Sequence, residues 1–520
     1  MPLWPIPKAS MFLASLARFM RALFHIPATE PANYPFVDSD VAQLHRLCAE
    51  PGAHAVDPAT WDDLMLGQYR AVLSHEVSIF GQQVLDRRLR EGGAQATAQP
   101  VRALLRDPAR VASLHLACKP LRHADREIAT LLFEDAEPVP PRWAGKTWIM
   151  PPLLLALMAA AMLWSPAAWL AVGALLYFLM SNQIRHAQAV EEWQRCLLSV
   201  QMLLRVASEQ GHADAAAAAR LNRALTRSPA SALVPGLRGY QDWFALANVN
   251  HYFHSARLVH ANLSLLRAAM LRVGALEADV ALARHLLATP QFCWAGRSGA
   301  REVTLRAVRH PLLTNAMPLT LELRGKGAFI SGQNGVGKST LLRTAGINLI
   351  AARAFGFCYA QAAEVPDLPV YSSIQNDDSL LGGESLYMAE LRRARQLLDA
   401  AEGPHAGVVL IDEIFRGTNH LESVSAAASV LDLLAQRGLV IVSSHHLVLA
   451  RLLEHRLMPL CVAPDARGVL ALAPGVLAHT NGIALLAERG FGPEVEANAG
   501  KPVQSKVRPY ITARIAAQAR

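Results

Sequence analysis

The sequence predicts an α/β domain towards the C-terminal end, preceded by all-helical regions that a long uncharged segment interrupts. Three observations predict this arrangement. From about residue 302, short runs of β-forming residues alternate with helical patterns. Before it, residues 60–135 place apolar side chains at helical spacing, and residues 186–287 are rich in Ala, Leu and Arg. Between these helical regions, residues 147–184 contain no Asp, Glu, Lys or Arg.

Length and composition limit the interpretation without fixing a function. The chain has 520 residues, which is enough for two to four domains with large cores. Its formal net charge is +8, which fits a nucleic acid or an anionic membrane surface as a partner. The six cysteines are scattered without C-x-x-C spacing, so neither a disulfide framework nor a zinc site is expected.

Breaks in the pattern divide the chain into six segments. The function of the first segment is not readable, and the basic last segment is typical of a solvated end, with a nucleic-acid arm as the alternative. The predicted segments are an N-terminal stretch (1–58), a helical region (59–141), a two-helix hairpin (147–184), a second helical region (185–298), the α/β domain (300–495) and a basic tail (496–520).

The uncharged segment predicts a transmembrane hairpin. It is too long for one span of about 20 residues and long enough for two short ones, with Ser165-Pro166 at the turn. Arg142, Lys146 and Arg185 flank the segment, whereas the turn carries no charge. The positive-inside rule then places both termini and the α/β domain in the cytoplasm, anchored at the cytoplasmic membrane. A buried helical hairpin inside a large core is the alternative.

A glycine-rich loop carries the strongest chemical signal. Residues 331–340 read Ser-Gly-Gln-Asn-Gly-Val-Gly-Lys-Ser-Thr, between an apolar run and a helical stretch. Glycines let the backbone wrap a phosphate, and the exposed N–H groups at the helix start attract its charge. Lys338 is expected to reach the β- and γ-phosphates, and Ser339 to ligate Mg²⁺. The expected nucleotide-binding residues are Gly332, Gln333, Asn334, Gly335, Val336, Gly337, Lys338, Ser339 and Thr340.

Two later strand ends supply candidate catalytic groups. Residues 407–413 form an apolar run that ends in Asp412 and Glu413. We expect Asp412 to hold Mg²⁺ and Glu413 to orient or deprotonate an attacking water. His445 follows another apolar run and is placed to contact the γ-phosphate, although a surface His pair with His446 is the alternative. The sequence contains no Asn-Lys-x-Asp guanine reader, which favours ATP over GTP.

These motifs together resemble the C-terminal ATPase domain of the MutS mismatch-repair family. The likeness covers about residues 300–495 and is weaker across the helical regions, which resemble pieces of the family's core and lever helices. It rests on the loop at 332–340, on Asp412-Glu413-Ile414-Phe415-Arg416-Gly417-Thr418, on Ser443-Ser444-His445, on Arg309-His310-Pro311, on residues 383–390 and on Asn481-Gly482-Ile483-Ala484.

The resemblance implies an ABC-type P-loop ATPase that works as a homodimer with ATP and Mg²⁺. Each site would combine the loop and Asp412-Glu413 of one subunit with Ser385 of the other. His310 would lie near the adenine, and Asn334 near the phosphates. In this interpretation, ATP clamps the dimer, hydrolysis releases it, and the core-like and lever-like helices transmit the change.

Departures from the family leave the substrate open. No Phe-x-Glu pair for reading a mispaired base is present, little of the sequence is left for a mismatch-binding domain, and Phe415 replaces the usual Gly. The first hypothesis is therefore a membrane-anchored, clamp-type MutS-like ATPase related to DNA repair or DNA binding. The alternative is an ATPase switch that acts on a protein or membrane partner without mismatch recognition. A transporter-type nucleotide-binding protein or a weakly active scaffold fits the motifs less well.

Overall fold

The structure is a computed structural model, and it divides the chain into two compact units. One unit is helical and holds residues 34–49, Leu73–Arg87 and the described part of 100–288; the other is α/β and holds 55–72, Arg88–Gln99 and the described residues from Thr289 onward. The described residues are 34–49, 55–134, 136–210, 213–227, 237–333, 335–374, 386–402, 407–416, 419–464 and 470–477.

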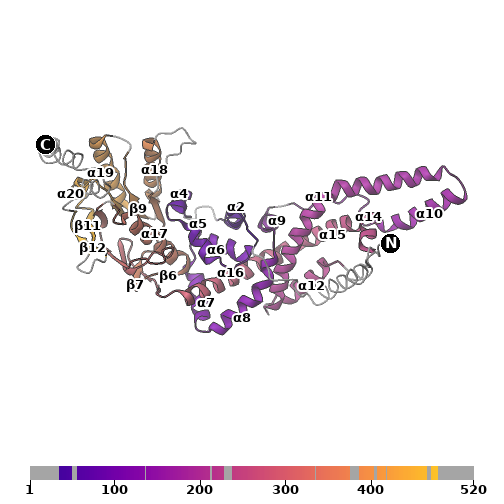
Figure 1. The fold of residues 1–520 in the computed structure, drawn as a ribbon, viewed down its shortest axis with the longest axis horizontal. Coiled ribbons are helices and arrows are strands. Elements are labelled where there is room, and N and C mark those ends of the chain that lie inside the picture. The colour runs from indigo at the N-terminus through magenta and orange to yellow at the C-terminus, as the bar shows by residue number, and fades with distance from the viewer. Residues whose placement is uncertain are drawn as a thin grey trace, which may run out of the picture. The chain divides into compact units, whose positions relative to one another are not determined.

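A six-stranded sheet forms the centre of the α/β unit (Figure 1). Its strand order is β12-β11-β5-β10-β9-β8, and all neighbours are parallel except the β11–β12 pair. The strands are β5 (Gly327–Gly332), β8 (Val370–Ser373), β9 (Val408–Asp412), β10 (Leu439–Ser443), β11 (Leu457–Pro464) and β12 (Leu470–Pro474).

Helices cover both faces of this sheet because its central strands are apolar on both sides. Every residue of β5 and β10 is buried, as expected for parallel strands between two helical layers. On β9 the side chains alternate: Val409 and Ile411 join the core under α18 (Leu386–Ala401) and α19 (His420–Arg437). Leu410 faces α17 (Lys338–Phe355), where Gly346 leaves room for it.

Smaller elements complete the α/β unit. A four-stranded sheet has the order β2-β7-β3-β4, and β1 pairs with β6. Helix α4 (Pro58–Asp63) packs against β8, where the buried Asp63 carboxylate accepts bonds from the Ser372 hydroxyl at 2.7 Å and the Ile374 amide at 2.9 Å. The remaining elements are β1 (Cys293–Trp294), β2 (Gly296–Arg297), β3 (Glu302–Val308), β4 (Leu319–Arg324), β6 (Phe357–Cys358), β7 (Ala362–Val365) and α20 (Val448–Leu452).

Long helices build the other unit. Apolar side chains from α11 (Ala168–Glu209) and α16 (Leu263–Ala288) supply much of its core. Residues of α5 (Leu66–Leu73), α6 (Ile79–Glu91) and α7 (Ala94–Leu105) belong partly to each unit. The other helices of this unit are α2 (Asp38–Val41), α3 (Gln43–Cys48), α8 (Pro108–Cys118), η1 (Lys119–His123), α9 (Ala129–Phe133), η2 (Thr147–Ile149), α10 (Met150–Leu163), α12 (Ala215–Leu225), α14 (Leu237–Phe244) and α15 (Ala247–Ala261).

The predicted transmembrane hairpin is wrong. The segment does form two paired helices, α10 and α11 (Figure 1). Helix α10, however, has only 14 residues, and the apolar run of α11 ends at Ser181-Asn182-Gln183. A span needs about 20 apolar residues, and among the described helices none is both long and apolar enough to cross a membrane. The predicted location at the cytoplasmic membrane rested on this hairpin and is contradicted with it. The boundaries of the six predicted segments stay predictions.

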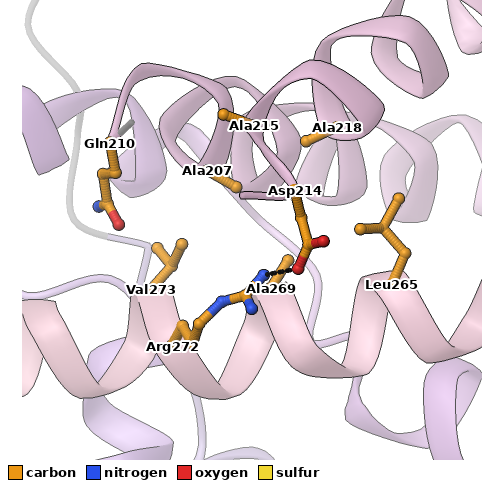
Figure 2. A pocket seen from close by; sticks show the side chains of 9 residues that line it. All are labelled: Ala207, Gln210, Asp214, Ala215, Ala218, Leu265, Ala269, Arg272 and Val273. Atoms are coloured by element: carbon orange, nitrogen blue, oxygen red, sulfur yellow. Dashed lines mark hydrogen bonds and ion pairs between the residues drawn. The ribbon is translucent and has the colours of Figure 1, made fainter. Parts of the chain in front are cut away.

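A small cavity lies where α11, α12 and α16 meet. It has a volume of about 10 Å³, close to the lower limit for one water molecule. Figure 2 shows Asp214 paired with Arg272 at 2.9 Å on one side and Gln210 on the other. The remaining lining side chains are apolar, so this cavity is a packing gap of the helical unit and offers no room for a larger ligand.

Buried Glu277 on α16 caps the start of α6 within the helical unit. Its carboxylate accepts bonds from the Ser78 amide at 2.9 Å, the Gly81 amide at 3.1 Å and the Ser78 hydroxyl. Burial raises the pKa of Glu277 to about 7, although the two amides, the hydroxyl and nearby Arg122 oppose this shift. Folding therefore favours the protonated form of this side chain between its ordinary pKa and about 7.

We predict that this carboxyl makes unfolding pH-dependent. As pH rises from about 4.5 to about 7, the unfolded state loses the Glu277 proton first, so the free energy of unfolding should fall. Between pH 5 and pH 8, the wild type should lose about 2 to 3 kcal/mol more stability than the Glu277→Gln variant, measured by chemical denaturation. Glu209→Gln, at a half-exposed position on α11, should keep the wild-type pH dependence. Equal pH dependence of wild type and Glu277→Gln would contradict this role.

Candidate functional site

The glycine-rich loop connects β5 to α17 at the carboxyl end of the sheet. Gly335 and Gly337 have φ angles of +76° and +97°, in the left-handed region that favours glycine. An added Cβ on Gly332 would lie 3.0 Å from a Val336 methyl and 3.2 Å from the Val462 carbonyl oxygen. Gly335 and Gly337 are therefore needed for their backbone conformation, and Gly332 is needed because other atoms approach it closely.

Lys338 is the first residue of α17 and folds back over the loop. Its Nζ donates to the carbonyl oxygens of Gly332 and Gln333, each at 3.0 Å. Burial lowers the pKa of Lys338, while the carboxylates of Asp412 and Glu413 act in the opposite direction. The ammonium group is thus held at the loop beside two acids, where a phosphate would add a third negative partner.

Asp412 lies at the end of β9 between two hydroxyl groups. Ser339 of α17 donates to its Oδ2, and Ser443 at the end of β10 donates to its Oδ1. The β9–β10 register places Ser443 directly opposite Asp412, and the β10–β5 register places it opposite Ile330. The parallel pairing therefore brings three separate segments of the sequence to one point.

Glu413 follows in a turn with an unusual backbone. Its φ angle is +59°, and its amide donates to the Ser443 carbonyl oxygen at 2.9 Å. One carboxylate oxygen, Oε1, lies 2.8 Å from His445 Nε2, and the other, Oε2, lies 3.5 Å from Arg416 Nε. Two basic side chains thus fix the direction of this carboxylate.

One open pocket joins these groups. It has a volume of about 470 Å³, within the usual range for a small-molecule site. Most of its wall consists of residues that were predicted to bind or act on the nucleotide, and the structure adds Arg416 to the basic groups there. The lining residues are Gly335, Gly337, Lys338, Ser339, Thr340, Asp412, Glu413, Arg416 and His445.

Other predicted residues lie elsewhere or outside the described residues. His310 is buried, accepts a bond from the Leu312 amide at 3.2 Å and does not line the pocket; burial, followed by nearby Arg343, lowers its pKa to about 4. Its assignment to an adenine stays a prediction. Asn334, Ser385, Gly417, Thr418 and the Asn481–Ala484 segment lie outside the described residues.

The two adjacent histidines differ in their surroundings. His445 points to Glu413, whereas His446 lies 3.4 Å from the Ser423 hydroxyl and packs edge-on against His420. Burial lowers the pKa of His446, and the neighbouring His420 lowers it further. Only His445 of this pair lines the pocket, and its contact with a γ-phosphate stays a prediction.

Sequence reasoning assigned no role to Arg416 or Phe415. Arg416 was visible as part of the run after Asp412-Glu413, but its partners on other elements were not. Phe415 has a φ angle of +59°, which explains why glycine suits this position in the resembled family. Its ring is buried, and it packs edge-on against Tyr387 of α18 with ring centres 6.2 Å apart.

A parallel sheet, a glycine-rich loop at a helix start and an acidic neighbouring strand end are together typical of phosphate-binding-loop proteins. Comparison with known families narrows this class. Residues 328–469 match the family model MutS domain V, so this part of the chain is similar to that domain.

Several curated proteins are similar to part of this chain. The DNA mismatch repair protein MutS of one strain of Thermus thermophilus is 31% identical over 256 residues, covering 48% of this chain and 30% of the relative. MutS of Thermus aquaticus is 32% identical over 211 residues, covering 39% and 26%. Endonuclease MutS2 of another Thermus thermophilus strain is 34% identical over 176 residues, covering 33% and 22%. The chain spans under a third of the length of these relatives, and the similarities support membership of the MutS family.

We predict that Phe415→Gly destabilises the chain although it relieves a left-handed backbone. The relief is worth about 1 to 2 kcal/mol, whereas loss of a buried Phe side chain costs about 3 to 5 kcal/mol. The net loss should therefore be about 1 to 4 kcal/mol in the free energy of unfolding, measured by chemical denaturation.

A second variant isolates the backbone contribution. Gly145 has a φ angle of +82°, and a Cβ added there would meet no other atom. Gly145→Ala should therefore lower the free energy of unfolding by about 1 kcal/mol through backbone strain alone. If Phe415→Gly were as stable as the wild type or more so, relief of backbone strain at residue 415 would at least match the lost packing of its ring, which would contradict the prediction.

Proposed function

We propose that this chain is a MutS-like ATPase that binds ATP in the pocket at the carboxyl end of its parallel sheet. The observation that carries the proposal is the convergence of Lys338, Ser339, Asp412, Glu413 and His445 on one pocket. The match of residues 328–469 to MutS domain V and the relatives named as DNA mismatch repair proteins support it.

Each side chain has a role that its position suits. Lys338, helped by the loop amides and the start of α17, would hold the β- and γ-phosphates. Glu413 would orient a water molecule for attack and accept its proton. His445 holds the Oε1 atom of that carboxylate at 2.8 Å, and Oε2, which lies 3.5 Å from Arg416 Nε, would use a remaining lone pair to accept from the water.

A magnesium ion fits the oxygen pair of Ser339 and Asp412, which both line the pocket. The Ser339 hydroxyl and the Asp412 carboxylate already contact each other, and Ser443 holds the far oxygen of Asp412. Mg²⁺ prefers such oxygen ligands and keeps several waters, completing its shell with phosphate oxygens. When bound, this ion would neutralise charge on the phosphates; Ser339 and Asp412 would hold it in place.

The proposal extends to a dimer with a shared site. In the resembled family, the second half of each site comes from another subunit, and Ser385 is the residue of this chain at that position. ATP would then hold two copies together and hydrolysis would release them. The relatives' names point to DNA as the partner, and the net charge of +8 favours phosphate contacts.

We predict that Glu413→Gln keeps ATP binding but loses most hydrolysis. Removing a general base costs roughly 100- to 10,000-fold in turnover, and the amide keeps the size of the side chain. Turnover is measured as phosphate release and affinity by equilibrium titration with ATP. With ATP bound, the variant should also sediment as a stable dimer.

Two comparisons make this test specific. Lys338→Ala should lose ATP affinity together with turnover, because the Lys338 ammonium would contact the phosphates. Glu402→Gln, which changes a largely exposed acid paired with Arg437, should behave as the wild type. Wild-type turnover in Glu413→Gln would show that another group activates the water.

We predict that the chain binds DNA mainly through phosphates and without preference for a mismatch. The sequence carries no Phe-x-Glu pair for reading a mispaired base, and its net charge of +8 favours contacts with phosphates. Affinity for homoduplex and mismatched DNA should be equal and should fall steeply as salt increases, measured by fluorescence anisotropy across a salt series. If no DNA binding is seen at low salt, a protein becomes the favoured partner in place of DNA.

A further inference from the structure

Helix α18 contacts the turn after Asp412 at two points. Tyr387 in its first turn packs edge-on against Phe415. One turn further along, Glu390 Oε1 lies 3.6 Å from Arg416 Nε. Two successive residues of the turn, one apolar and one charged, are therefore attached to the same helix.

The Glu390 carboxylate is buried beside the core of the α/β unit. Only 1% of its side chain is exposed, whereas 41% of the Arg416 side chain is exposed. A buried carboxylate is costly unless a cation or hydrogen-bond donors compensate its charge. Arg416 is one such cation, and its attraction to Glu390 favours a guanidinium held at the inner end of the turn.

Arg416 lies between two carboxylates. The same Nε atom that faces Glu390 lies 3.5 Å from Glu413 Oε2. His445 takes the opposite oxygen of Glu413, so the carboxylate is held from both sides. Without Glu390, the Arg416 side chain would regain rotamer freedom and would hold Glu413 in one direction for less of the time.

We propose that Glu390 is a positioning residue, which fixes the Glu413 carboxylate by anchoring Arg416. This inference rests on the proposed ATPase function, because it assigns Glu413 to the hydrolytic step. It also gives α18 a role in hydrolysis: the position of this helix decides where Arg416 is held, and hence how Glu413 faces the water. Glu390 itself is not among the residues that line the pocket.

Glu390→Gln should separate turnover from binding. A misdirected general base lowers kcat by roughly 10- to 100-fold, while KM for ATP and the ATP affinity should stay within about twofold, because Lys338 and the loop are unchanged. Glu390→Asp keeps the charge and should recover part of kcat. Asp399→Asn is the matched control, since it neutralises an exposed acid on the same helix, paired with Arg395, and should leave kcat unchanged.

A double variant tests whether Arg416 carries the effect. If Glu390 acts through Arg416, the Glu390→Gln/Arg416→Gln variant should have the kcat of Arg416→Gln alone, so the two losses should not multiply. Arg416→Gln alone, at a partly exposed position, should reproduce the loss of kcat even if Glu390→Gln fails to fold. Multiplying losses would show that Glu390 acts by another route and overturn the proposal.

The outcomes distinguish this inference from the proposed function. If the wild type hydrolyses ATP and Glu390→Gln matches Asp399→Asn, the positioning role is wrong and the ATPase stands. If Glu390→Gln loses kcat, ATP affinity and melting temperature together, Glu390 is only structural. If the wild type hydrolyses no more ATP than Lys338→Ala, the ATPase function fails, and the positioning role fails with it.

Discussion

The site depends on the parallel pairing of β5, β10 and β9. Because the register sets Ser443 opposite Asp412, the hydroxyls of Ser443 and Ser339 can hold the two oxygens of a single carboxylate. Each of these groups comes from a different segment of the chain, and none reaches the others without the sheet. The buried, apolar strands therefore do more than stabilise the fold, since their alignment to within one residue determines whether the site exists.

Charge balance is the second constraint on the pocket. Two acids lie close together at the strand end, and such a pair is unfavourable without cations nearby. Lys338 compensates from the loop side and Arg416 compensates beside Glu413, while His445 Nε2 contacts the other oxygen of Glu413. An incoming polyphosphate would compete with these acids for the same cations. Glu390, placed behind Arg416 and away from the pocket, gives that cation an anchor which phosphate binding need not displace.

Local motifs were predictable from the sequence, whereas contacts between distant segments were not. The loop at 332–340 and the strand ending in Asp412 are contiguous patterns with fixed chemistry, and the structure places described members of both at one pocket. The Arg416–Glu390 pair and the Tyr387–Phe415 contact join residues of separate elements, so no spacing in the sequence indicates them. The prediction for 147–184 was wrong because a segment without charges was treated as apolar throughout. Ser181, Asn182 and Gln183 carry no charge, but their side chains are polar and end the apolar run.

Helix α11 is continuous by hydrogen bonding but unequal along its length. Its 42 residues extend over about 63 Å. The second half contributes a dense series of buried side chains, including Val200, Leu203 and Leu204, whereas the first half has few, and Trp169 and Tyr177 there are exposed. Since local opening follows the number of buried contacts, backbone amides of the first half should exchange with solvent deuterium much sooner than those of the second. One uninterrupted helix would then contain a fast-exchanging and a slow-exchanging segment, and the boundary between them would lie within the helix.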